Sequence, residues 1–163
     1  MNNSRKSQSF KLRKIISGGQ TGADRAGLDA AVALGIEYGG ALPRGRKTED
    51  GPLSTKYTGM TELPTGNYAS RTVQNVKAAD ATLVFMDGKA GAGTALTVRI
   101  CNSLAKPFLI IDFKAAGADP ADRILDWLNS VRPSILNIAG SRESLSPGTY
   151  KQTLKLLKTV LKK

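Results

Sequence analysis

The chain has 163 residues, 40% of them hydrophobic, with one cysteine and no histidine. This length suits one globular domain with an adequate core. The lack of histidine excludes Ser-His-Asp triads, Cys-His pairs and histidine-based metal sites. The formal net charge is +11, yet the chain between residues 15 and 150 holds 14 basic and 13 acidic side chains. The positive excess therefore lies at the two ends, where no aromatic interleaving occurs, and we do not expect a nucleic-acid partner.

No segment of the sequence predicts a membrane or secretory destination. The wholly apolar runs, such as residues 108–111, are far too short to span a bilayer, and residues 1–13 contain no apolar signal segment. Cys101 lies in an apolar helical pattern and is typical of a buried thiol in a reducing compartment. We expect a cytoplasmic protein with a flexible basic leader over residues 1–13 and a single domain over residues 14–163. Removal of residues 1–12 is expected to leave thermal stability nearly unchanged.

The most informative segment, residues 17–24, joins a short β-branched run at residues 14–16 to a helix. Its glycines let the backbone turn sharply and approach a ligand, and the first helical amides favour an anion. The spacing matches neither a P-loop nor the dinucleotide fingerprint, so a phosphate-bearing ligand is favoured without being identified. A tight turn without a ligand is the alternative. The candidate ligand-binding residues here are Gly18, Gly19, Gln20, Thr21, Gly22 and Asp24.

A strand over residues 37–41 is followed by a long segment without periodicity that ends near residue 68. A connection of this length in a compact domain is usually functional or disordered, and we interpret it as a lid. Arg44, Arg46 and Lys47 place three cations at its start. They predict a clamp on phosphate or another oxyanion, with a solvated loop as the alternative.

Two further polar loops follow predicted strands. A helix over residues 68–79 precedes an apolar strand at 81–86, whose loop contains Asp87, Gly91, Gly93 and Thr94 and opens into another helix. A strand at 108–112, a helix at 122–131 and a strand at 134–138 come next, and the last strand leads to Ser141, Arg142 and Glu143. A final helix begins near Pro147. This alternation predicts an α/β fold, a doubly wound parallel sheet of about five strands with helices on both faces.

Together these motifs resemble the putative molybdenum carrier family over roughly residues 14–150. The resemblance is carried by residues 18–29, 43–52, 71–72, 75–76, 93–97 and 137–144. That family is similar to circularly permuted members of the SLOG superfamily, relatives of the lonely-guy phosphoribohydrolases and the DNA-processing proteins. It implies a Rossmann-like, nucleotide-binding type of sheet and a carried ligand, the molybdenum cofactor or a related phosphorylated heterocycle. It also implies an acceptor molybdoenzyme as a partner, and we expect a homo-oligomer.

The permutation implies the strand order 2-1-5-3-4, which brings the three glycine-bearing loops to one edge; the order 2-1-3-4-5 would place Arg142 away from them. The phosphoribohydrolase relatives carry a catalytic glutamate where this chain has Thr97. General acid–base work at that position is lost, so we favour a binding protein over an enzyme. The alternatives left open are a nucleotide-derivative hydrolase that uses Asp24, Asp87 or Glu143, and a nucleic-acid-associated module.

Overall fold

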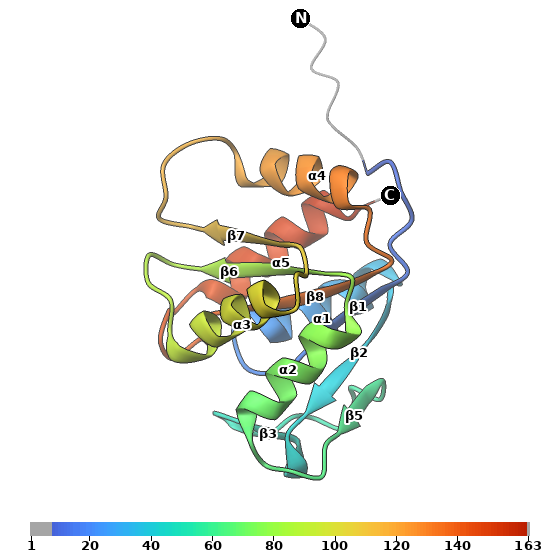
Figure 1. Ribbon diagram of the computed structural model, residues 1–163, viewed down its shortest axis with the longest axis vertical. Coiled ribbons are helices and arrows are strands. Elements are labelled where there is room, and N and C mark those ends of the chain that lie inside the picture. Colours follow the sequence, from blue (N-terminus) through green and yellow to red (C-terminus); the bar gives the residue numbers. More distant parts are fainter. Residues whose placement is uncertain (1–7, 163) are drawn as a thin grey trace, which may run out of the picture.

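The computed structural model describes residues 8–162, and Figure 1 shows a central sheet with helices on both faces. Within these residues the main sheet has six strands, all parallel, in the order β5-β2-β1-β8-β6-β7. The strands are β1 (Lys14–Ser17), β2 (Glu37–Leu42), β5 (Met60–Glu62), β6 (Ala81–Met86), β7 (Phe108–Asp112) and β8 (Ile135–Gly140). The helices are α1 (Ala23–Leu34), α2 (Tyr68–Ala78), α3 (Ala92–Ser103), α4 (Pro120–Val131) and α5 (Thr149–Val160).

The order of the five predicted strands is confirmed. The strand that comes last in the sequence, β8, lies between β1 and β6, so the loops that follow these three strands share one edge of the sheet. The predicted number of strands was low by one, because β5 pairs with β2 at the sheet margin. This strand has three residues, two of them exposed, and such a short edge strand carries no readable alternation.

Helices cover both faces of the sheet (Figure 1). Helices α1, α4 and α5 pack together on one face, while α2 and α3 contact each other on the opposite face (Figure 1). The larger apolar cluster lies under the first group and includes Ile15, Leu83, Phe85, Ile124, Leu128, Leu136, Ile138 and Leu157. Small residues of α1 allow close packing, since a Cβ on Gly27 would lie 2.7 Å from Ile138 Cβ.

The turn between β1 and α1 depends on one glycine. Gly22 is the N-cap residue of α1 and has φ 76°, a conformation that favours glycine. A Cβ there would lie 2.2 Å from the Ser141 carbonyl oxygen, and the next amide, Ala23 N–H, donates to that same oxygen over 3.1 Å. The first loop is thereby joined directly to the loop after β8.

The segment predicted to be a lid has structure of its own. It contains a short 3-10 turn (Arg44–Arg46), an antiparallel hairpin of β3 (Lys47–Thr48) and β4 (Gly51–Pro52), and then β5. Leu53 and Tyr57 are buried against Leu28 and Leu42 in a small second core. The segment is therefore packed onto α1 and β2, and its elements were too short to show a period.

Part of the predicted leader also packs on the domain. Leu12 is 5% exposed within the large core, and Phe10 is half-buried against it. The Arg13 amide donates to the Ser134 carbonyl oxygen over 3.0 Å. Removal of residues 1–12, which we expect to leave thermal stability nearly unchanged, would thus remove this apolar pair from the core, while residues 1–7 lie outside the described part of the chain. None of the helices in the described residues is long and apolar enough to cross a membrane.

Candidate functional site

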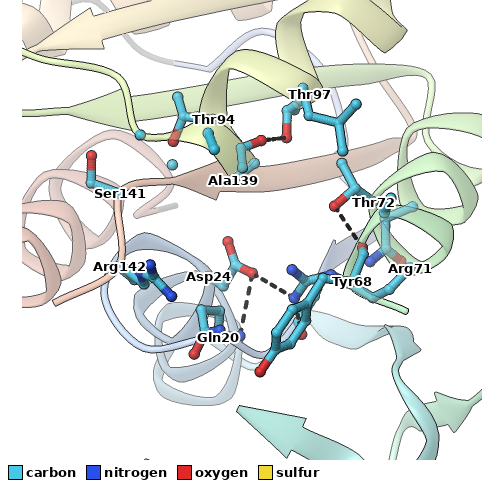
Figure 2. A pocket seen from close by; sticks show the side chains of 18 of the residues that line it. Gln20, Asp24, Tyr68, Arg71, Thr72, Thr94, Thr97, Ala139, Ser141 and Arg142 are labelled. Carbon is cyan, nitrogen blue, oxygen red and sulfur yellow. Dashed lines mark hydrogen bonds and ion pairs between the residues drawn. The ribbon is translucent and has the colours of Figure 1, made fainter. Parts of the chain in front are cut away.

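A cavity of about 480 Å³ opens between α2, α3 and β8 at the carboxyl edge of the sheet. Figure 2 shows it as a hollow whose wall is formed by side chains from the loops after β1, β6 and β8 and from α2. In open parallel sheets this edge, where neighbouring strands lead to opposite faces, is the usual ligand position. The fold thus supplies a site between segments that are far apart in the sequence.

The cavity contains a buried ion pair between Asp24 and Arg71. Asp24 is 7% exposed, and its Oδ2 lies 3.6 Å from Arg71 Nη1 and accepts the Gln20 amide over 3.2 Å. Arg71 also donates to the Gly18 carbonyl oxygen over 2.8 Å and packs 5.4 Å from the Tyr68 ring centre (Figure 2). Burial raises the pKa of Asp24 to about 6, against the opposing effect of Arg71 and of the Gln20 amide. Asp24 does not cap α1; it connects the first loop to α2.

Several hydrogen-bond donors that line the cavity have no partner among residues 8–162. Helix α3 begins at its N-cap Gly91 without a side-chain cap, and its first intrahelical amide bond runs from Ala95 to Gly91 over 3.0 Å. The amides before Ala95 are therefore left without a helical partner. Ser141 is 4% exposed, and its Oγ and Arg71 Nε have no hydrogen-bond partner within the described part of the chain. Buried donors of this kind indicate a site for an acceptor-rich group.

Arg142 is held at the cavity by a carboxylate from the β3–β4 hairpin. Its Nε lies 3.5 Å from Glu49 Oε2, and Glu49 also accepts hydrogen bonds from the Thr21 hydroxyl and from the Ser144 amide. The Glu49 amide donates to Gln20 Oε1 over 2.9 Å. Burial of the Glu49 carboxyl opposes ionisation, but these hydrogen bonds and Arg142 leave its pKa below the ordinary value. Glu49 thus joins the β3–β4 hairpin to the loops after β1 and β8 and orients a cation.

The structure brings half of the predicted site residues into this cavity, namely Gly18, Gln20, Asp24, Gly91, Gly93, Thr94, Ser141 and Arg142. Three others, Thr21, Gly22 and Glu143, line a second hollow of about 610 Å³ on the far side of the first loop. Glu143 is engaged there by the amides of Gly148 and Tyr150, at 2.6 and 2.9 Å, and so stabilises the start of α5.

Five predicted residues line neither hollow: Gly19, Arg44, Arg46, Lys47 and Asp87. Arg46 donates instead to the carbonyl oxygens of Leu53, Ser54 and Tyr57 and stabilises its own loop. Lys47 lies 5.0 Å from the Tyr68 ring centre, and Arg44 is exposed. The described cavity receives its arginines from other places, at positions 71, 99 and 142.

The sequence analysis missed the contribution of α2, from which Tyr68, Arg71, Thr72 and Asn75 line the cavity. Asn75 is 3% exposed, and its amide both accepts from the Ala41 N–H and donates to the Ala41 oxygen, so it fixes α2 against β2. The sequence did carry a signal for them. Arg71 and Asn75 are four residues apart, and this spacing places both polar side chains on the same face of the helix.

Thr97 lies in the cavity wall, but its hydroxyl is already hydrogen-bonded within its own helix. Its hydroxyl donates to the Gly93 carbonyl oxygen over 3.0 Å (Figure 2). A threonine hydroxyl does not ionise near neutral pH, so this position supplies no general base. Among residues 8–162, no three His, Cys, Asp or Glu side chains gather into a metal-binding group.

A doubly wound parallel sheet with a polar cavity at its carboxyl edge defines a Rossmann-like protein with a small-molecule type of site. The model of the circularly permutated YpsA SLOG family matches residues 15–161, and the chain belongs to this family. The crystal structure of a putative molybdenum carrier protein from Syntrophus aciditrophicus SB is 42% identical, with a TM-score of 0.88. The match covers 92% of this chain and 95% of that chain. No curated protein sequence matches.

Proposed function

We propose that the protein is a carrier that binds the molybdenum cofactor, or a related phosphorylated heterocycle, in the cavity between α2, α3 and β8. The structural neighbour is named as a putative molybdenum carrier protein, and the family is a SLOG family. The proposed ligand has a phosphate group and a flat ring system, and it is held without being turned over. An acceptor molybdoenzyme in the cytoplasm and a homo-oligomeric state belong to the same proposal.

One observation carries this proposal: several hydrogen-bond donors around the cavity have no partner among residues 8–162. They are Ser141 Oγ and Arg71 Nε, together with the uncapped first amides of α3, whose residues line the same cavity. Phosphate and oxometal oxygens accept several hydrogen bonds at once, and the positive end of a helix favours their charge. Arg142, held at the cavity by Glu49, adds a guanidinium suited to bidentate contact.

Native mass spectrometry of the freshly purified chain, with elemental analysis for molybdenum, tests the proposal. We expect a bound mass that corresponds to a phosphorylated heterocycle, with molybdenum in proportion to it. Ser141→Ala should reduce the bound fraction, and Thr153→Ala, which removes another buried hydroxyl that has no partner among residues 8–162 but lies outside the cavity lining, is the control. A protein that carries no phosphorylated molecule and binds no added phosphate ester would refute the carrier function.

A further inference from the structure

Asp24 differs chemically from every other charged group that lines the cavity. Among the described lining residues it is the one acid, whereas Arg71, Arg99 and Arg142 are cations. The Gln20 amide and Arg71 both approach Oδ2, and the Gly18 backbone contributes a further hydrogen bond to the carboxyl group. In Figure 2 the other carboxylate oxygen points away from Gln20 and Arg71 and into the cavity. A buried carboxylate is stabilised by each hydrogen bond that it accepts, so this oxygen suits a donor from a ligand.

We infer that Asp24 determines which organic group the carrier accepts, by taking a hydrogen bond from an N–H or O–H donor that lies away from the ligand's anionic end. The inference rests on the proposed function and deepens it. The arginines and the α3 amides suit the anionic end, because they offer donors alone. A ligand is then oriented with its phosphate toward α3 and a neutral donor group toward Asp24.

Two parts of a nucleotide-like or pterin-like molecule offer such donors. One is the amino group and ring N–H of an amino-keto heterocycle, as in guanine or a pterin, and the other is a ribose hydroxyl. A site that hydrogen-bonds a donor rejects the analogue that lacks it, because its own polar group is left unpaired. A ligand that turns a carbonyl oxygen toward Asp24 is rejected further by repulsion between two acceptors.

Calorimetric titration of the full chain at pH 8 tests this inference, since the Asp24 carboxyl, with its pKa of about 6, is then ionised. The probes are GMP, IMP, which lacks the 2-amino group, 2′-deoxy-GMP, which lacks one ribose hydroxyl, and pyrophosphate as the anionic end alone. We expect GMP to bind most tightly, with IMP or 2′-deoxy-GMP weakened by roughly 10- to 100-fold. A lower affinity for IMP than for GMP assigns the donor to the heterocycle. A lower affinity for 2′-deoxy-GMP than for GMP assigns it to the sugar.

Asp24→Asn should remove this discrimination, while Asp122→Asn, the same change in the exposed first turn of α4, should retain it. If Asp24→Asn does not fold, the wild-type series decides alone. Equal affinities for the three nucleotides, pyrophosphate binding as tight as that of GMP, or discrimination retained by Asp24→Asn would each overturn the inference and leave anion binding intact. Failure of all four probes to bind would overturn the phosphate-binding proposal as well.

Discussion

Gly93→Asp tests the anion-binding wall of the cavity most directly. Gly93 is the second residue of α3 and lines the cavity, and a Cβ built there meets nothing within 4 Å. The substitution therefore introduces a carboxylate beside the free amides without a steric clash. Because an acidic side chain in the first turn interacts favourably with the helix dipole, the unliganded protein should gain roughly 0.3–1 kcal/mol of stability.

The same carboxylate should strongly oppose an anionic ligand. Two unit charges ~4 Å apart repel by about 4 kcal/mol at an effective dielectric constant of about 20. After partial screening by salt, this repulsion corresponds to an affinity loss of roughly 100- to 1,000-fold. The expected signature is a protein with an unchanged or higher melting temperature that has lost its ligand.

Calorimetric titration with GMP, together with thermal unfolding, measures both effects. Gly93→Asn has nearly the same size without the charge and is the matched control, so it should lose far less affinity than Gly93→Asp. Ala116→Asp adds the same charge on an exposed loop outside the cavity and should leave affinity unchanged. An unchanged affinity in Gly93→Asp would refute the placement of the anion at α3.

Three further expectations concern stability and chemistry. Leu12→Ala should lower the free energy of unfolding by about 2–4 kcal/mol, because Leu12 is 5% exposed in the large core; a change below the error of urea unfolding would contradict this packing. The folded state raises the pKa of Asp24 from 3.8 to about 6, so it binds this proton more tightly than the unfolded chain does. Stability should therefore fall as pH rises from about 4 to about 6, and Asp24→Asn should show a smaller fall in pH-resolved unfolding curves. Finally, incubation with AMP should release no adenine by chromatography, because Thr97 offers no carboxylate; release that disappears in Asp24→Asn would favour a hydrolase instead.

Local patterns in the sequence were sufficient for the elements that are long and strongly periodic. The helix at residues 23–34 follows from its stripe of small apolar residues, and the strand at 81–86 from its continuous apolar run. The glycine-rich loops after residues 14–17 and 81–86 could be predicted because, at each of them, a strand leads directly into a helix. These signals are local, since side chains repeat every 3.6 residues along a helix and every two along a strand.

The strand order was reached through the family resemblance rather than through any periodic signal. No feature of residues 135–140 alone indicates that they lie between β1 and β6, because parallel pairing joins residues about 120 positions apart in the chain. The three-residue β5 and the hairpin β3–β4 were missed for a related reason. Their stability comes from Leu53 and Tyr57 packing under the loop, not from a pattern within the strands.

By itself the sequence determined the fold class and the glycine-bearing strand-to-helix turns. Tertiary structure alone decided which charged groups share the cavity. In the folded chain Arg46 donates to carbonyl oxygens of its own loop, Arg71, 47 residues beyond Asp24, lies beside that carboxylate, and the Ser141 hydroxyl is buried without a partner among residues 8–162. The reason is physical: a turn or a helix depends on neighbouring residues, whereas burial, charge pairing and the pKa of Asp24 depend on what the folded chain places around each group.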